Sequence, residues 1–144
     1  MSDKKVTVVI TSYNRFEFLK KTIDSFLTLN TYPIERFLVI EDSTKQEIKH
    51  QILDTYKDKV ELIFNETNLG QPLSIDKAYK TVNTEYIFHS EDDYLYTGNP
   101  NFIKDSMDIL EEKKSINQIW LRHLDNYIVS HGAEGLNQFE KDTL

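Results

Sequence analysis

The sequence predicts one α/β domain in which a mostly parallel sheet lies between two helical layers. Short apolar runs rich in β-branched residues alternate with amphipathic segments of helical length, which is the pattern of right-handed βαβ units. The first run, VTVVIT, contains almost no polar residues, as expected for a strand buried on both faces. The length agrees, because 144 residues, 39% of them hydrophobic, suffice for one core and are too few for two.

The expected elements follow in chain order. Strands are expected where apolar runs occur, at residues 6–11 (VTVVIT), 36–41 (RFLVIE), 60–65 (VELIFN), 85–90 (EYIFHS) and 115–123 (SINQIWLRH). Helices are expected where apolar residues recur every three or four positions, at residues 16–27, 48–56, 75–83 and 99–110. Gly70 and Pro72 mark the turn into the third helix, and Asn99-Pro100 opens the fourth.

Composition excludes several classes of function. The net charge is −7, so a phosphate polymer would be repelled on average and no nucleic-acid partner is expected. The chain has no cysteine, which removes disulfides, zinc–thiolate sites and thiol nucleophiles and fits a reducing compartment. No apolar run approaches the length of a membrane span and no signal segment is seen, so the expected location is cytoplasmic.

Polar side chains gather where the expected strands end. Ligands of such sheets collect beyond the carboxyl ends of the strands, and the fourth strand runs directly into Glu91, Asp92 and Asp93. Three neighbouring carboxylates suit a hard divalent cation, Mg²⁺ or Mn²⁺, bridging to a diphosphate. The alternative is that they only solvate a turn, and composition alone does not decide between the two.

The other strand ends offer groups suited to a nucleotide. Asp42 offers an acceptor for the N3–H of a uracil, Thr11 a partner for a carbonyl, and Tyr13 a flat face for a base. Arg15 suits a phosphate, with a surface ion pair as the alternative. Neither a GxGxxG nor a GxxxxGK[ST] motif is present.

Four segments in order, VTVVITSYNR, LVIEDS, NLG and TEYIFHSEDD, together resemble the nucleotide-binding part of a family 2 glycosyltransferase of the GT-A fold. The resemblance runs over about residues 5–97, with continuation to about residue 123. It implies a Rossmann-like α/β/α sandwich that binds a nucleotide-diphosphate sugar, most often a UDP-sugar, with Mn²⁺ or Mg²⁺. The expected reaction is transfer of the sugar to a glycan, lipid or protein acceptor, with inversion.

The resemblance also implies roles for individual residues. Thr11, Tyr13 and the pair Glu41/Asp42 match positions that hold base and ribose, and which of the two acids faces uracil is left open. Glu91-Asp92-Asp93 matches the DXD element, with Asp92 near the ribose or sugar. Asp93 and Glu91 are the expected metal ligands. Asn68 and Gly70 match the turn into the next helix.

Two departures from the family pattern concern the diphosphate and the catalytic base. Ile75 and Asp76 stand where the family often has an Arg–Asn pair, so Lys77 is the expected substitute contact to the diphosphate. Residues 1–97 are the expected nucleotide-binding core, and residues 98–144 the expected helix, strand and shortened acceptor-side tail of the same domain. The family's catalytic Asp usually lies many tens of residues beyond the DXD element, but only 51 residues of the 144 follow Asp93 here. Asp125 is the candidate for the catalytic base, with a loop residue of no catalytic role as the alternative.

Two other functions remain open. A shortened domain of this type would bind nucleotide without turnover, and would form a homo-oligomer through an apolar surface beside the fifth strand. A sugar nucleotidyltransferase would use a similar sheet, but such enzymes usually have a Gly-rich, basic first loop, which TSYNRFEF lacks.

Overall fold

The computed structural model describes residues 4–121 and contains four strands and four helices. In chain order they are β1 (Val6–Ser12), α1 (Phe16–Leu29), β2 (Arg36–Glu41), α2 (Gln46–Tyr56), β3 (Glu61–Phe64), α3 (Gln71–Tyr79), β4 (Tyr86–Glu91) and α4 (Phe102–Glu112). The chain divides into two compact units, Met1–Met107 and Asp108–Leu144. The first unit contains the whole sheet.

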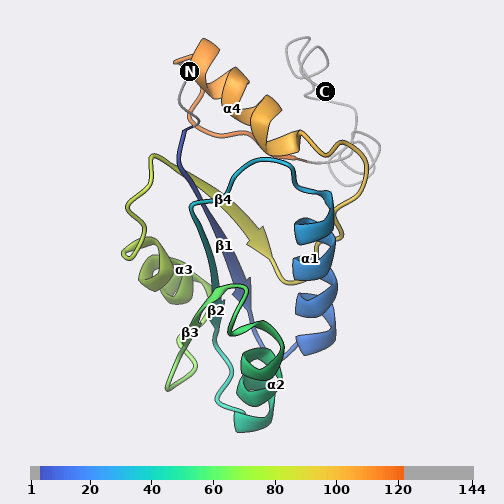
Figure 1. Ribbon diagram of the computed structural model, residues 1–144. Helices are drawn as coiled ribbons and strands as arrows, with labels where there is room; N and C mark the ends of the chain where they lie inside the picture. Colours follow the sequence, from blue (N-terminus) through green and yellow to red (C-terminus); the bar gives the residue numbers. More distant parts are fainter. Residues whose placement is uncertain (1–3, 122–144) are drawn as a thin grey trace, which may run out of the picture. The chain divides into compact units, whose positions relative to one another are not determined.

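The sheet is parallel throughout, with strand order β3-β2-β1-β4 (Figure 1). β1 lies between β2 and β4, and each of its residues is buried, which explains the lack of polar relief in its sequence. The chain moves outward from β1 through β2 to β3 and then returns to the opposite side of β1 as β4. The strand order therefore reverses between β1 and β4, and a crevice is expected beyond the carboxyl ends of these two strands.

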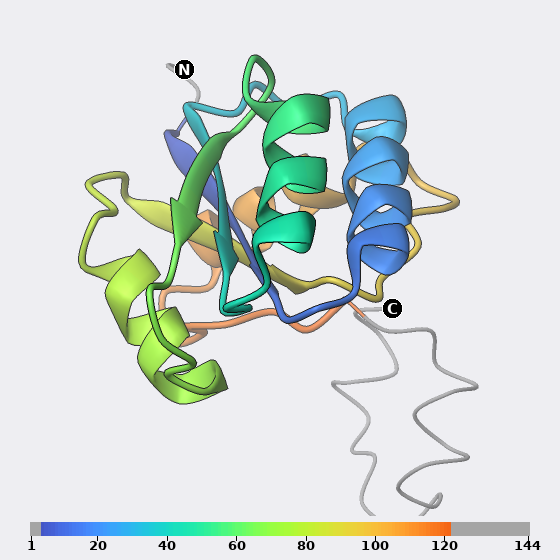
Figure 2. The same ribbon diagram turned by 90° about the horizontal axis from the view of Figure 1, so that it is seen from below.

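The reversal also sets which helices cover which face. Right-handed crossovers in opposite directions place their helices on opposite faces of a parallel sheet. One apolar cluster accordingly joins the sheet to α1, α2 and the start of α4, and the other joins it to α3. Figure 2 shows α1 and α2 together on one side of the sheet and α3 on the other. The predicted α/β/α arrangement is confirmed.

Phe26 lies at the centre of the first cluster. It follows Leu19 and Ile23 at helical spacing on α1, and all three side chains are fully buried. Four aromatic rings surround it with centroids 5.1–5.8 Å away, those of Phe37, Phe88, Tyr96 and Phe102. These contacts connect α1 with β2, β4 and the segment after β4, so they fix the helix that begins beside the strand ends.

Two predicted elements differ from the structure. The third helix ends at Tyr79 and not near Asn83, because the chain tightens into turns in which the Thr81 and Val82 amides bond to carbonyls three residues back. The predicted fifth strand is wrong over residues 115–121, which form no strand among the described residues. Its apolar residues favour extended structure, but a strand exists only where a neighbouring strand satisfies its backbone groups. Residues 122 and 123 lie outside the described range.

Within residues 4–121, no helix is both long enough and apolar enough to cross a membrane.

Candidate functional site

A cleft of about 370 Å³ opens at the carboxyl ends of β1 and β4, where the strand order reverses. The segment after β1, the residue after β2, the start of α3 and the end of β4 all contribute to its walls. The lining residues are Thr11, Ser12, Tyr13, Arg15, Asp42, Asn68, Gly70, Gln71, Ser74, Glu91 and Asp92. The structure thus brings most of the predicted nucleotide-binding residues to one place.

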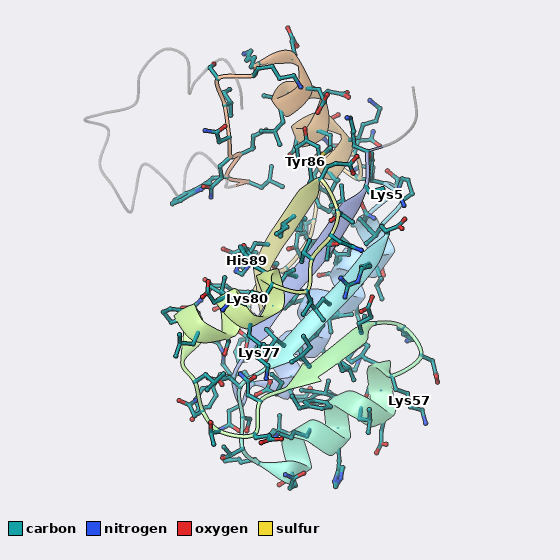
Figure 3. The ribbon with its side chains drawn as sticks, turned by 90° about the vertical axis from the view of Figure 1, so that its left-hand side faces the viewer. Lys5, Lys57, Lys77, Lys80, Tyr86 and His89 are labelled. Atoms are coloured by element: carbon teal, nitrogen blue, oxygen red, sulfur yellow. The ribbon has the colours of Figure 1, made fainter. Side chains whose placement is uncertain are left out.

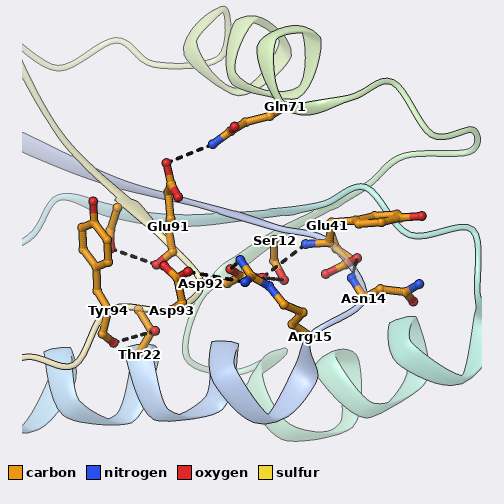
Figure 4. Close-up of polar contacts among 12 residues, drawn as sticks. Ser12, Asn14, Arg15, Thr22, Glu41, Gln71, Glu91, Asp92, Asp93 and Tyr94 are labelled. Carbon is orange, nitrogen blue, oxygen red and sulfur yellow. Dashed lines mark hydrogen bonds and ion pairs between the residues drawn. The ribbon is translucent and has the colours of Figure 1, made fainter. Parts of the chain in front are cut away.

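Asp92 is one of two buried acids that line this cleft. It is 1% exposed and accepts hydrogen bonds from the Ser12 hydroxyl at 3.1 Å and the Tyr13 amide at 3.4 Å. Arg15 adds two contacts, from Nε to Oδ2 at 3.2 Å and from Nη2 to Oδ1. These bonds tie the end of β4 to the loop after β1 (Figure 4). Hydrogen bonding to Asp92 raises the pKa of the Arg15 guanidinium, so Arg15 stays charged at physiological pH.

The two neighbouring acids point elsewhere. The Asp93 side chain is 39% exposed and pairs with Arg15 Nη1 at 3.4 Å. Glu91 turns the other way and accepts a hydrogen bond from Gln71 Nε2 at 3.0 Å (Figure 4). The three consecutive acids therefore do not converge on one point.

This arrangement tests whether a divalent cation fits. Residues 4–121 contain no group of three or more Asp, Glu, His or Cys side chains able to enclose a metal ion. Mg²⁺-like ions, however, are usually held by one or two carboxylates together with substrate phosphates and water. Asp93 offers one accessible carboxylate of the required hard-oxygen type. The residues present would fit such a cation, with Asp93 as its contact to the protein and phosphate or water at its other positions.

The segment after the acids is fixed to α1. Thr22 donates its hydroxyl hydrogen to the Tyr94 carbonyl at 2.7 Å (Figure 4), and Ser25 Oγ accepts from the Tyr96 amide at 3.1 Å. The Tyr96 hydroxyl reaches back to Ser90 Oγ, at 2.6 Å. The acids are therefore held from both sides, by β4 before them and by α1 after them.

Asp42 forms the opposite wall and is saturated with hydrogen bonds. Its Oδ1 accepts from Asn65 Nδ2 at 2.7 Å and from the Leu69 amide at 2.8 Å. Its Oδ2 accepts from Asn68 Nδ2 at 3.0 Å and from the Gly70 amide at 2.8 Å. Burial alone would raise the pKa of this carboxyl, but the hydrogen bonds from the 65–70 loop outweigh burial and lower it below its ordinary value of 3.8.

Gly70 closes that loop with a backbone that side chains disfavour. Its φ is +79° and its ψ is 161°, in a region that is essentially restricted to glycine. This conformation directs the Gly70 amide to Asp42 and starts α3 at the next residue. The sequence-based prediction of a turn at this glycine is confirmed.

Glu41 lies behind the cleft and is not one of its lining residues. It is fully buried, and its Oε1 accepts from the Asn14 amide at 2.9 Å and the Ser43 amide at 2.8 Å. Asn14 has a φ of +62°, an uncommon value outside glycine, and this bond helps to hold it there. Among the described residues, Glu41 Oε2 has no hydrogen-bond partner. Of the two adjacent acids, Asp42 is the one that reaches the cleft.

Among the described residues, three predicted site residues do not line the cleft: Glu41, Asp93 and Lys77. Lys77 lies on α3 (Figure 3), and its ammonium donates to Asn65 Oδ1 at 2.7 Å, so its charge supports the loop that Asp42 organises. Asp125 lies outside the described residues. Conversely, sequence reasoning missed Gln71 and Ser74, which line the cleft from the first turns of α3. Their position directly after the Gly70 turn, which was predicted to border the site, could have indicated that they line it.

Comparison with known sequences identifies the family. The glycosyl transferase family 2 profile matches residues 7–125, most of the chain. The chain belongs to glycosyl transferase family 2. An uncharacterized glycosyltransferase of Rickettsia felis is 28% identical over 131 residues, and one of Rickettsia conorii is 27% identical over 131 residues. Each alignment covers 91% of this chain and 19% of the relative, so the chain spans about a fifth of these proteins.

Solved structures share the GT-A fold of this family. The mannosyltransferase PcManGT of Pyrobaculum calidifontis, in complex with GDP-Man and Mn²⁺, superposes with a TM-score of 0.64 at 15% identity, covering 76% of this chain and 33% of that protein. TarS 1–349 of S. aureus in complex with UDP-GlcNAc gives 0.61 at 24% identity, covering 83% and 37%. At these identities the likeness establishes the fold.

Proposed function

We propose that this chain is the donor-binding part of a glycosyltransferase that transfers a sugar from a nucleotide-diphosphate sugar, with UDP-sugars as the first class to test. The observation that carries the proposal is the cleft at the switch point, where a buried, organised acid (Asp92) stands next to an accessible one (Asp93). Family membership and the nucleotide sugars in the structural neighbours support the same reading.

The proposed contacts to the nucleotide follow the walls of the cleft. Thr11 and the half-exposed ring of Tyr13 hold the base, and Asn68 and Gly70 border it from the opposite wall. Asp42 positions that wall through its four hydrogen bonds, and it meets the base only by giving up one of them.

The proposed contacts to the sugar and metal follow the end of β4. Asp92 accepts from ribose or sugar hydroxyls, and Arg15 contacts the diphosphate. Asp93 binds Mn²⁺ or Mg²⁺, whose charge stabilises the departing diphosphate. Glu91 becomes a second ligand only if it leaves Gln71.

The proposed reaction is a single displacement. The acceptor hydroxyl oxygen forms a bond to the anomeric carbon, and the bond from that carbon to the diphosphate oxygen breaks with inversion. The nucleoside diphosphate leaves with the electron pair, and a general base takes the acceptor proton. Asp125 is the base to test first.

Calorimetric titration tests donor binding. UDP, GDP and TDP would be titrated into the protein in Mn²⁺ and again in EDTA, with Asp93→Asn and Asp54→Asn as charge-matched variants. Asp54 is exposed on α2, away from the cleft, so its variant controls for the lost charge. We expect UDP to bind in Mn²⁺, and binding to weaken at least about tenfold in EDTA and in Asp93→Asn.

Two results would contradict the proposal: binding of no nucleotide in either buffer, or equal UDP affinity in Asp93→Asn and the unchanged protein. Tight UDP binding without hydrolysis of UDP-sugars or transfer to any supplied glycan would instead favour the alternative of a domain that binds nucleotide without turnover.

A further inference from the structure

Two acids at the end of β4, Asp92 and Asp93, are paired with one positively charged side chain, that of Arg15. Its guanidinium contacts Asp92 through Nε and Nη2 and Asp93 through Nη1 (Figure 4). Arg15 Cζ also lies over the Phe18 ring, 5.8 Å from the ring centroid. Arg15 therefore occupies the position of an internal counter-cation for both acids.

The two contacts of Arg15 differ in kind. The contact to Asp92 uses two nitrogens and two oxygens, and Ser12 and the Tyr13 amide hold the buried carboxylate in place. The contact to Asp93 is one nitrogen at 3.4 Å from an oxygen of a side chain that is 39% exposed. Bidentate contacts to a buried carboxylate persist, whereas single exposed ion pairs are weak. Asp93 is the partner that Arg15 can release.

The cleft offers little other positive charge. Among the described residues that line it, Arg15 is the single Lys or Arg. On α3, Asp76 pairs with Lys80 at 3.7 Å, and the Lys77 ammonium donates to Asn65. An anionic ligand in this cleft would therefore find Arg15 as its nearest fixed cation.

We propose that Arg15 exchanges Asp93 for the diphosphate of the donor, so that a divalent cation and the nucleotide bind together and not independently. This inference rests on the proposed function. A cation that approaches Asp93 alone meets the guanidinium, which repels it and competes for the same oxygen. With a diphosphate present, Arg15 Nη1 gains an anionic partner while its other nitrogens stay on Asp92. Asp93 is then released to the cation.

Manganese binding without nucleotide tests the competition directly. Electron paramagnetic resonance of free Mn²⁺ would give its affinity for the unchanged protein, Arg15→Gln, Arg15→Lys and Arg36→Gln. Arg36 forms a comparable bidentate pair with Glu61 at the start of β2, at the opposite end of the sheet, and serves as the matched control. Calorimetry at saturating Mn²⁺ would give the UDP affinity of the same four proteins.

We expect Arg15→Gln to bind Mn²⁺ about fivefold more tightly, since removing a unit charge about 4 Å away has this effect even at the dielectric constant of water. Its UDP affinity should fall about tenfold or more, because the diphosphate loses its cation. Arg15→Lys keeps the charge and should keep the weak Mn²⁺ binding, and Arg36→Gln should match the unchanged protein in both assays.

An Arg15→Gln protein whose Mn²⁺ affinity is unchanged or lower would overturn the exchange. So would an unchanged UDP affinity in that variant while the original protein binds UDP. Absence of UDP binding in all four proteins would overturn the proposed function and the diphosphate half of the exchange, and the Mn²⁺ measurement would still report whether Arg15 competes for Asp93. The circular dichroism spectrum of each variant establishes that it is folded.

Discussion

Replacing Asp42 with asparagine changes one atom of the side chain and removes half of its hydrogen bonds. Asparagine keeps one acceptor oxygen, and its amide nitrogen must face either Asn65 and the Leu69 amide or Asn68 and the Gly70 amide. In either orientation two donors lose their acceptor. Hydrogen bonds to a charged group contribute about 1.5–3 kcal/mol each, so the free energy of unfolding should fall by about 3 kcal/mol or more.

The effect should depend on pH in a defined direction. The pKa of Asp42 is lowered in the folded protein, so its contribution to stability is complete above its ordinary value of 3.8 and is lost as the pH falls through the lower folded value. The difference between the two proteins should therefore be largest near neutral pH and shrink below about pH 4.

Urea unfolding of Asp42→Asn, the unchanged protein and Asp54→Asn at pH 7 and at pH 3 would measure both quantities. Asp54→Asn carries the same charge change at an exposed site and should stay within about 0.5 kcal/mol of the unchanged protein. The assigned role of Asp42 would be refuted by an Asp42→Asn protein as stable as that control at pH 7, or by a difference that does not shrink at pH 3.

Three further substitutions test other parts of the fold by the same unfolding measurement. Gly70→Ala should cost about 1–3 kcal/mol although a Cβ there meets open space, because the backbone conformation is restricted to glycine; a loss below about 0.5 kcal/mol would contradict this. Glu41→Gln should change the free energy of unfolding by less than about 1 kcal/mol, since the amide keeps an oxygen for the Asn14 and Ser43 amides and removes a buried charge. Glu41→Ala removes that acceptor and should lower the free energy of unfolding by more than about 2 kcal/mol. Equal losses of stability in Glu41→Gln and Glu41→Ala would contradict the role of Glu41 as acceptor for these two amides. Phe26→Ala should cost about 3–5 kcal/mol with unchanged secondary structure, and a loss near 1 kcal/mol would mean that the cavity closes.

The fold could be predicted from the sequence because the clearest hydrophobic patterns lie in the segments that are buried. β1 reads as a continuous apolar run since both of its faces are covered, and the α1 stripe reads as helical since Leu19, Ile23 and Phe26 face one cluster. The predicted strand at 115–123 also contains β-branched and aromatic residues, but the propensity of a run does not supply a neighbouring strand.

The sequence predicts which residues gather at the site, but it does not predict which of them contact one another. Strand ends meet at one edge of a parallel sheet, so Thr11, Asp42 and Asp92 were expected together and are found together. Which neighbouring group a charged side chain contacts depends on differences of a few ångströms in tertiary structure. Lys77 had the right charge and helix for a diphosphate contact, but its ammonium lies on Asn65, and Arg15 reaches the acids instead.

The position of β4 beside β1 has a consequence for how the cleft comes into being during synthesis. β1 pairs with β2 after a single intervening helix, but the bond from Ser12 to Asp92 joins residues 80 positions apart. Pairings of such large sequence separation form late, because much of the chain must be ordered before they close. A nascent chain that has folded as far as β3 contains Thr11 and Asp42 but lacks the acids at the end of β4. If the cleft binds a nucleotide as proposed, that binding would require completed folding and would stabilise the last strand to dock.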